Sequence, residues 1–272
     1  MPTLRDIKRR IRAVNNTRQI TKAMKMVAAS KLRKSQTRML ELRPYADKMS
    51  AVLGNLAKSA DSGLHPLLVV RPRKTVEVLV ITSDRGLCGA FNSNILRAGA
   101  GYISNLKDKG FDVTVSAIGK KAIDYFKRRN VRMRKSWVGL SGRVSYPNAQ
   151  EVAKDIMDGY ISETVDEVIL IYNEFKSVIA QKVAEMKLLP LASVDGSEGS
   201  EQAMNFLYEP SQEEIFNVLL PKNVEIQVFR ALLESQASEE AARMKAMENA
   251  TKNANEMIDR LTLQYNKARQ AT

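Results

Sequence analysis

The sequence has very few residues of the types that build metal, redox and membrane-spanning sites. It contains one cysteine, Cys88, and one histidine, His65, among 272 residues. A single cysteine excludes an internal disulfide and suits a reducing compartment, and a single histidine excludes a histidine-rich metal site. No apolar run approaches the ~20 residues of a membrane-spanning helix, and the start lacks a secretory apolar segment. We therefore expect a soluble intracellular protein that has no bound metal or cofactor and does not insert into the membrane.

Proline and glycine are also absent from two long stretches, residues 3–43 and 222–272. Because these are the two residues that most disfavour a helix interior, each stretch can form one long helix. At ~1.5 Å per residue such a helix is on the order of 75 Å long. A globular domain about 30 Å across cannot bury it, so part of each helix must project and contact something else.

Apolar residues recur in both stretches at alternating spacings of three and four. In the first they are Leu4, Ile7, Ile11, Val14, Leu32, Met39, Leu42, Ala46, Met49, Leu53 and Leu56. In the second, where a threonine joins the repeat, they are Met244, Met247, Thr251, Ala254, Ile258, Leu261, Tyr265 and Ala268. A 3.5-residue repeat keeps one stripe facing a partner helix. The pattern predicts that residues 1–58 and 210–272 form an antiparallel coiled coil around an inserted domain, with an ordinary helical bundle as the alternative.

Positive charge is concentrated at the start of the chain. The sequence carries a net charge of +13, and residues 1–40 hold twelve Lys and Arg against one acid, Asp6. Such a face can attract nucleic acid or an acidic protein, or it can be a solvated surface. No aromatic residue precedes Tyr45 to stack on bases, and no groove-reading motif is present, so the pattern disfavours nucleic acid.

The middle of the first apolar stripe is polar, because Arg18, Thr21 and Lys25 occupy it. An apolar strip displaced to one side accompanies these residues, and it consists of Ile20, Met24 and Val27. We therefore expect the contact between the two helices to loosen here, and the first helix to offer this strip and its charges to a third partner.

The inserted segment alternates apolar strands with helices. Strands are expected at 75–82, 111–118, 133–138, 167–172 and, on the sheet edge, 178–188, with helices at 91–109, 120–129 and 148–164. This alternation predicts an α/β domain over residues 75–193 with a mixed, mostly parallel, Rossmann-like sheet, flanked by linkers 59–74 and 194–209. A short helix is expected from Pro210, and a separate long helix from Pro221.

The segment Ser83–Gly89 (SDRGLCG) follows a strand and precedes a helix, where phosphate-binding loops occur. Its glycine spacing matches neither the dinucleotide fingerprint nor the P-loop. A catalytic thiol at Cys88 would need His65 as its base, so we disfavour this role too. We interpret the segment as a tight, exposed turn that is capped by Asp84 and presents Arg85 to a partner.

Three motifs together resemble the gamma subunit of F-type ATP synthase over essentially the whole chain. They are ITKAMKMVAA at 20–29, SDRGLCGA at 83–90, and SEEAARM, NATKNA and YNKARQA in the carboxy-terminal stretch at 238–271. The absence of a long cysteine-bearing insertion makes the sequence similar to bacterial members. The family usually extends a few helical turns beyond a position equivalent to Thr272.

The resemblance implies a rotor shaft without its own active site. The coiled coil would enter a ring of alpha and beta subunits, and the α/β domain would lie beside the epsilon subunit and the c ring, on the cytoplasmic face of the inner membrane. Residues that would contact the alpha/beta ring are Arg269, Gln270, Arg243, Lys22, Lys25, Arg85 and Cys88. Those near epsilon and the c ring would be Tyr208 and Glu209. Two alternatives remain, a nucleic-acid-binding coiled coil that uses the basic first helix and a nucleotide-dependent enzyme built on the insertion.

Overall fold

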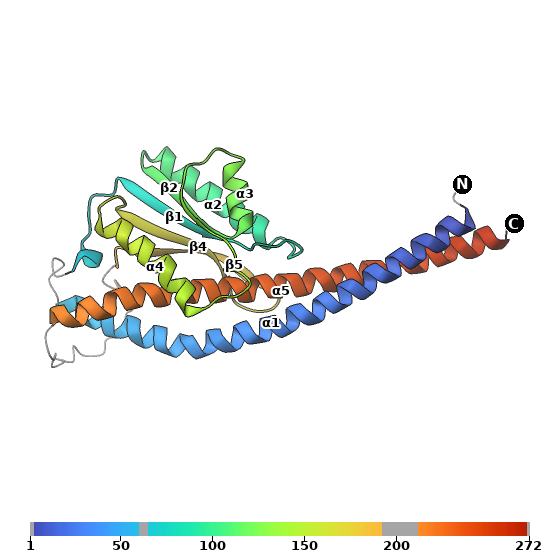
Figure 1. Cartoon of the computed structure of the whole chain (residues 1–272), viewed down its shortest axis with the longest axis horizontal. Coiled ribbons are helices and arrows are strands. Elements are labelled where there is room, and N and C mark those ends of the chain that lie inside the picture. The colour runs from blue at the N-terminus through green and yellow to red at the C-terminus, as the bar shows by residue number, and fades with distance from the viewer. Residues whose placement is uncertain (1–2, 60–64, 192–211, 271–272) are drawn as a thin grey trace.

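Two long helices dominate the computed structural model, which describes residues 3–59, 65–191 and 212–270. Helix α1 spans Leu4–Ser59 and helix α5 spans Gln212–Gln270. They lie side by side and antiparallel, so the start of α1 and the end of α5 both lie at the tip that is farthest from the α/β domain (Figure 1). At ~1.5 Å per residue each helix is about 85 Å long. The predicted antiparallel helix pair is confirmed.

The apolar stripe predicted from the sequence is the contact line between α1 and α5, which we call the seam. On α1 the seam residues are all buried or half-buried where their side chains are described, whereas most of the residues between them are exposed. Fully buried examples are Ile7, Ala28, Leu32, Met39 and Ala46. On α5, Met247 and Ala254 are buried at the matching spacing. The 3.5-residue repeat therefore identified the contacting face correctly along the described helix pair.

The insertion is a five-stranded sheet with the order β3-β2-β1-β4-β5. The strands are β1 (Thr75–Ile81), β2 (Asp112–Ile118), β3 (Met133–Trp137), β4 (Glu167–Phe175) and β5 (Gln181–Leu189). The first four strands in this order pair in parallel, and β5 pairs antiparallel with β4 at one edge. The predicted mixed, mostly parallel sheet with an edge strand after residue 178 is confirmed.

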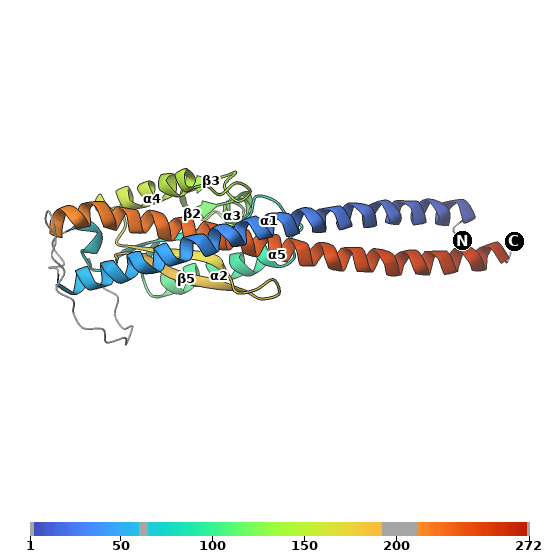
Figure 2. The ribbon, with the colours of Figure 1, turned by 90° about the horizontal axis from the view of Figure 1, so that it is seen from below.

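Helices cover both faces of the sheet and divide its core in two. Helices α2 (Phe91–Asp108) and α3 (Lys120–Lys127) pack on one face, where Val78, Val80 and Val115 are buried. Helix α4 (Tyr146–Ile161) and the first half of α5 pack on the other face. Helix α5 lies between the sheet and α1 (Figure 1), and the two helices run together past the domain (Figure 2). This position explains why even polar residues such as Glu234 and Ser238 on α5 are fully buried.

The prediction of a break at Pro221 is wrong, because α5 begins at Gln212 and continues through this proline. A proline inside a helix removes one backbone hydrogen bond and crowds the preceding turn, at a cost of about 3 kcal/mol. Burial of Phe216, Leu220 and Val224 on the turns around it offsets this cost, at roughly 1.5–3 kcal/mol per large side chain. Helix α1 likewise continues through Pro44.

The segment before β1 is packed against the domain. Pro66–Leu68 forms a single 3-10 turn with Leu67 and Leu68 buried, and His65 Nδ1 accepts the Leu67 N–H at 3.1 Å. Burial lowers the pKa of His65, which favours its neutral form. Among the helices that the structure describes, none is both long and apolar enough to cross a bilayer.

Candidate partner-binding site

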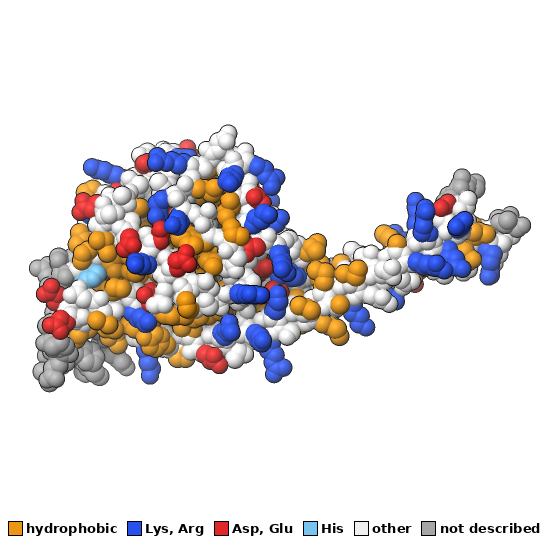
Figure 3. Space-filling view, in the orientation of Figure 1, with side chains coloured by type: hydrophobic (Ala, Val, Ile, Leu, Met, Phe, Trp, Pro, Cys, Tyr) orange, Lys and Arg blue, Asp and Glu red, His pale blue; other side chains and the backbone are white. Residues whose placement is uncertain are grey.

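The free ends of α1 and α5 extend beyond the sheet domain as a bare two-helix rod. We call residues 4–28 of α1 and 247–270 of α5 the rod. Basic side chains gather near its tip, and an apolar group lies between this tip and the domain (Figure 3). Because only two helices are present, more than half of the residues in the rod are exposed. Other proteins can therefore surround the rod and contact it on several sides.

Polar residues bridge the two helices in the middle of the rod, where the sequence predicts that their apolar contact loosens. Thr21 Oγ1 lies 2.8 Å from Thr251 Oγ1, and Lys25 Nζ lies 2.7 Å from Glu248 Oε1. Arg18 Nη1 donates to Asn255 Oδ1 at 3.3 Å. Each polar residue on α1 therefore has a polar partner on α5, and hydrogen bonds replace apolar contact.

Beside this polar stretch, a groove of about 830 Å³ runs between the helices and includes Lys22 and Met26. Lys22 is exposed and forms no ion pair within the residues that the structure describes. The displaced strip is exposed as expected at Ile20 (59%) and Val27 (56%), whereas Met24 is half-buried. The rod therefore displays apolar and cationic side chains together, which suits an acidic amphipathic partner segment.

Arg269 and Gln270 lie in the last turn of α5, and both side chains are exposed at the free tip. Neither makes an ion pair within the part of the chain that is described, so both can contact a partner. Tyr208 and Glu209 lie outside the described residues.

Asp84 anchors the loop between β1 and α2 to other elements, in place of the local cap expected from the sequence. Its carboxylate accepts the Lys120 N–H, the Gly139 N–H and the Ser141 hydroxyl, each at 3.0 Å. These bonds tie the loop to α3 and to the segment after β3. Arg85 is exposed at the loop tip, as expected, and Leu87 beside it is 65% exposed with a φ of +63°.

Cys88 lies on the inner side of the same loop and is only 2% exposed. Asn92 Nδ2 donates to its Sγ at 3.2 Å. Burial raises the pKa of the Cys88 thiol, which keeps it protonated and a poor nucleophile. Cys88 therefore helps to hold the loop, and the side chains that the loop offers to a partner are those of Arg85 and Leu87.

Arg243 lies where this loop meets α5, and its side chain forms ion pairs with other residues of the chain. Its guanidinium contacts Glu239 at 2.5 Å and Glu240 at 2.9 Å, and Lys31 of α1 lies 3.7 Å from Glu240. Arg243 is only 11% exposed. Burial raises the pKa of Glu239 to about 7, against the opposing effect of Arg243. We call these four residues the junction cluster. The burial of its two carboxylates could not be predicted, because nothing in the sequence distinguishes Glu239 and Glu240 from exposed acidic residues on a helix.

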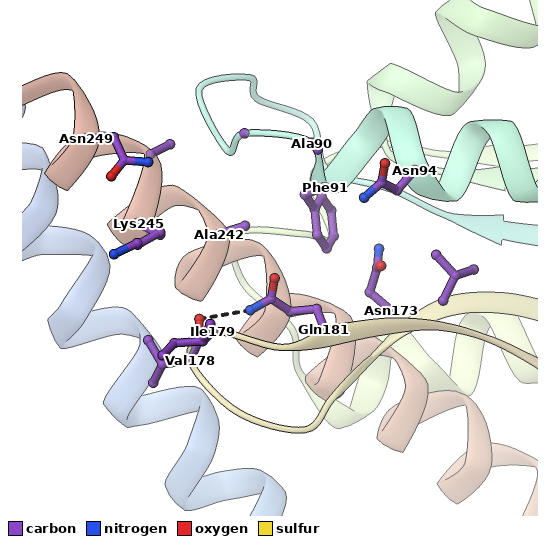
Figure 4. A pocket seen from close by; sticks show the side chains of 13 residues that line it. Ala90, Phe91, Asn94, Asn173, Val178, Ile179, Gln181, Ala242, Lys245 and Asn249 are labelled. Atoms are coloured by element: carbon purple, nitrogen blue, oxygen red, sulfur yellow. Dashed lines mark hydrogen bonds between the residues drawn. The ribbon is translucent and has the colours of Figure 1, made fainter. Parts of the chain in front are cut away.

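A cavity of about 230 Å³ adjoins the junction cluster, between α2, α5 and the β4–β5 hairpin. In Figure 4, Phe91 and Asn94 face Asn173 across it, and Lys245 and Asn249 line it from α5. The side-chain amide of Gln181 already has a partner within the chain, because its Nε2 donates to the Val178 carbonyl at 2.9 Å. No group of His, Cys, Asp and Glu within residues 3–59, 65–191 and 212–270 could hold a metal ion.

The fold and these surfaces define an elongated shaft protein: two antiparallel helices carry an α/β domain at one end and present a bare rod at the other. The family model described as ATP synthase matches residues 3–272. The ATP synthase gamma chain of Anaeromyxobacter sp. (strain Fw109-5) is 50% identical over 274 residues, covering 100% of this chain and 94% of the relative. That of Geobacter metallireducens is 47% identical over 271 residues, with the same coverage. The chain belongs to the ATP synthase gamma-chain family, whose members are non-catalytic central-stalk subunits, peripheral to the membrane.

Solved structures support the same assignment. A chain of the Tetrahymena thermophila mitochondrial ATP synthase central stalk and c ring is 30% identical, with a TM-score of 0.63, and the match covers 85% of this chain and 99% of that one. A chain of the Euglena gracilis mitochondrial ATP synthase shares the fold at 20% identity, with a TM-score of 0.67 and coverage of 98% and 89%.

Proposed function

We propose that this chain couples rotation of a c-subunit ring to the catalytic cycle of the alpha/beta ring in a bacterial F-type ATP synthase. In this proposal the rod turns inside the alpha/beta ring, and the α/β domain lies at the foot of the shaft, beside the epsilon subunit and the c ring. The complex lies on the cytoplasmic face of the inner membrane. Proton flow drives ATP synthesis, and ATP hydrolysis drives the reverse rotation.

The observation that supports the proposal is the bare rod that projects from the α/β domain. A rod that transmits torque must resist bending and twisting, and two helices with interlocked side chains are stiffer than one. It must also present different faces to equivalent sites around it, so that they adopt different conformations in turn. The apolar strip at Ile20 and Val27 lies on one side of α1 only, which makes the rod asymmetric.

Specific contacts with the alpha/beta ring are assigned to exposed side chains. In this proposal, Arg269 and Gln270 at the tip hydrogen-bond a loop of a beta subunit during rotation. Lys22 and Arg85 attract acidic segments of beta over a longer range. Lys25 and Arg243 instead form ion pairs within the chain. Lys25 pairs with Glu248, and Arg243 pairs with Glu239 and Glu240 of the junction cluster.

Reconstitution with matching alpha and beta subunits, followed by incorporation into the membrane complex, tests the proposal. We expect an ATP-hydrolysing assembly that pumps protons, and a several-fold loss of both activities in Arg269→Ala/Gln270→Ala. The matched control is Asn266→Ala/Lys267→Ala on the same exposed turn, which should keep both. Wild-type activity in the Arg269/Gln270 variant would refute these contacts.

The same purified chain separates the alternatives. Saturable micromolar binding of ATP or NAD by the chain alone would favour an enzyme built on the α/β domain. Salt-sensitive duplex DNA binding without any affinity for alpha and beta subunits would favour a DNA-binding coiled coil.

A further inference from the structure

The end of β4 extends beyond the strand beside it and contacts α5 instead. The pairing of β4 with β1 runs from Glu167 to Ile171, and no later residue of β4 pairs with β1. Asn173 and Phe175 lie beyond this point, still paired on the other side with β5. Their backbone groups on the β1 side would be left without partners, which is costly inside a protein.

Two buried side chains of α5 satisfy two of these groups. Glu234 Oε2 accepts the Phe175 N–H at 3.1 Å, and Ser238 Oγ donates to the Asn173 carbonyl at 3.1 Å. Glu234 and Ser238 are one turn apart and both are 0% exposed. Helix α5 thus takes the place of a neighbouring strand at the end of β4.

The side chain of Phe175 reinforces this connection. It packs in one buried cluster with Leu32 and Met39 of α1 and with Ala237 and Ala241 of α5. The last residue of β4 therefore contacts both helices of the shaft close to the point where the bare rod begins. The charge of Glu234 is balanced on the same helix by Arg230, whose Nε lies 3.2 Å from Glu234 Oε1.

We infer that Glu234 and Ser238 are positioning residues that lock the shaft to the α/β domain and transmit torque between them. Apolar burial is non-directional, so by itself it fixes the rotation of a helix on a sheet less sharply than a directional bond does. A hydrogen bond weakens steeply when its geometry changes. Two such bonds from successive turns of α5 to one strand resist rotation of the helix about its own axis. This inference rests on the proposed rotor function.

The first test uses the free chain and needs no partner. Hydrogen exchange should show a strongly protected Phe175 amide, exchanging at least about tenfold faster in Glu234→Ala. Glu234→Gln keeps an acceptor oxygen and should keep the protection. Equal exchange of Phe175 in all three chains would overturn the assigned bond.

The second test uses the assembled complex and makes two measurements. One is the number of protons pumped per ATP hydrolysed. The other is the angular fluctuation of a probe attached to the α/β domain while the rod is held in the alpha/beta ring. Glu234→Ala/Ser238→Ala should lower the pumping ratio about twofold or more and widen the fluctuations. Ser235→Ala is the matched control, because Ser235 is equally buried but makes no hydrogen bond to the sheet within the described residues. Glu234→Gln should behave like wild type.

A wild-type ratio and angular width in an assembled double variant would overturn the inference. If that variant fails to assemble, Ser238→Ala alone removes one bond with little change in volume, and a wild-type result there counts equally against it. Failure of the rotor function itself would be distinct, because the wild-type chain would then show no rotation at all.

Discussion

Thr21 of α1 and Thr251 of α5 face each other across the seam, with their hydroxyl oxygens 2.8 Å apart. Each hydroxyl also lies near a carbonyl of its own helix, at Arg18 and Met247. A polar pair inside a coiled coil fixes the relative alignment of the helices at some cost in stability. In the rod, this pair determines which residue of α1 lies opposite which residue of α5.

We expect Thr251→Val alone to reduce the free energy of unfolding by about 1 kcal/mol, because Thr21 loses its partner across the seam. The double variant Thr21→Val/Thr251→Val should recover this loss, since both polar groups are then replaced by apolar ones of similar shape. Urea unfolding of the three chains measures the difference. A double variant that is less stable than the single one would contradict this account.

Arg243→Ala should destabilise the chain strongly, by about 3–5 kcal/mol, because it leaves Glu239 and Glu240 buried beside each other without their shared guanidinium. Arg243→Lys keeps the charge but not the two-sided contact, so it should lose less. Thermal unfolding of both variants provides the measurement. If Arg243→Ala folds with wild-type stability, Arg243 does not stabilise the fold through the junction cluster. Direct contact with a partner would then be the better explanation of its role.

The raised pKa of Glu239 predicts an unusual pH dependence. Its pKa is about 7 in the folded chain, against an ordinary value of 4.5. The folded chain therefore binds more protons than the unfolded chain between these values, and the free energy of unfolding falls as the pH rises from about 4.5 to 7. The fall from this group should be about 3 kcal/mol, since each pKa unit corresponds to about 1.4 kcal/mol.

Glu239→Gln should flatten this part of the profile, while Arg243 keeps Glu240 as a partner at 2.9 Å. The exposed substitution Glu256→Gln serves as the control. Urea unfolding at a series of pH values gives the comparison. An unchanged slope in Glu239→Gln would mean that another group titrates there.

The ion pair between Lys25 and Glu248 predicts the opposite dependence at low pH. Bonds from Lys25 and Lys245 lower the pKa of Glu248 to about 2. A lowered pKa contributes stability that is present above about pH 4.5 and is lost as the pH falls towards 2. Because Glu248 is solvent-exposed, the contribution should also shrink in high salt. A Lys25→Met chain with an unchanged acid profile would contradict this assignment.

The helix pair could be predicted from the sequence because its cause is local and periodic. Every seam position from Leu4 to Leu53 with a described side chain is at least half-buried, as the 3.5-residue repeat requires. The alternation of strands and helices likewise identified the sheet and its edge strand. These patterns depend on neighbouring residues in the chain, which the sequence displays directly.

The errors arose where the outcome depends on residues far apart in the chain. Arg18 and Lys25 looked like a weak point in the seam, because their partners Asn255 and Glu248 lie more than 200 residues away. Pro221 looked like a helix start, because the packing that carries the helix through it comes from the sheet domain. The sequence does not indicate what Glu234 and Ser238 contact, because the end of β4 to which they bind is defined only by the folded sheet.

Direct observation of rotation tests the central claim of this account. The chain is assembled with alpha and beta subunits from the same organism, the alpha/beta ring is fixed to a surface, and a visible probe is attached to the exposed face of the α/β domain. On addition of ATP, we expect the probe to turn continuously in one direction. An assembly that hydrolyses ATP at a normal rate while the probe stays still would contradict the account.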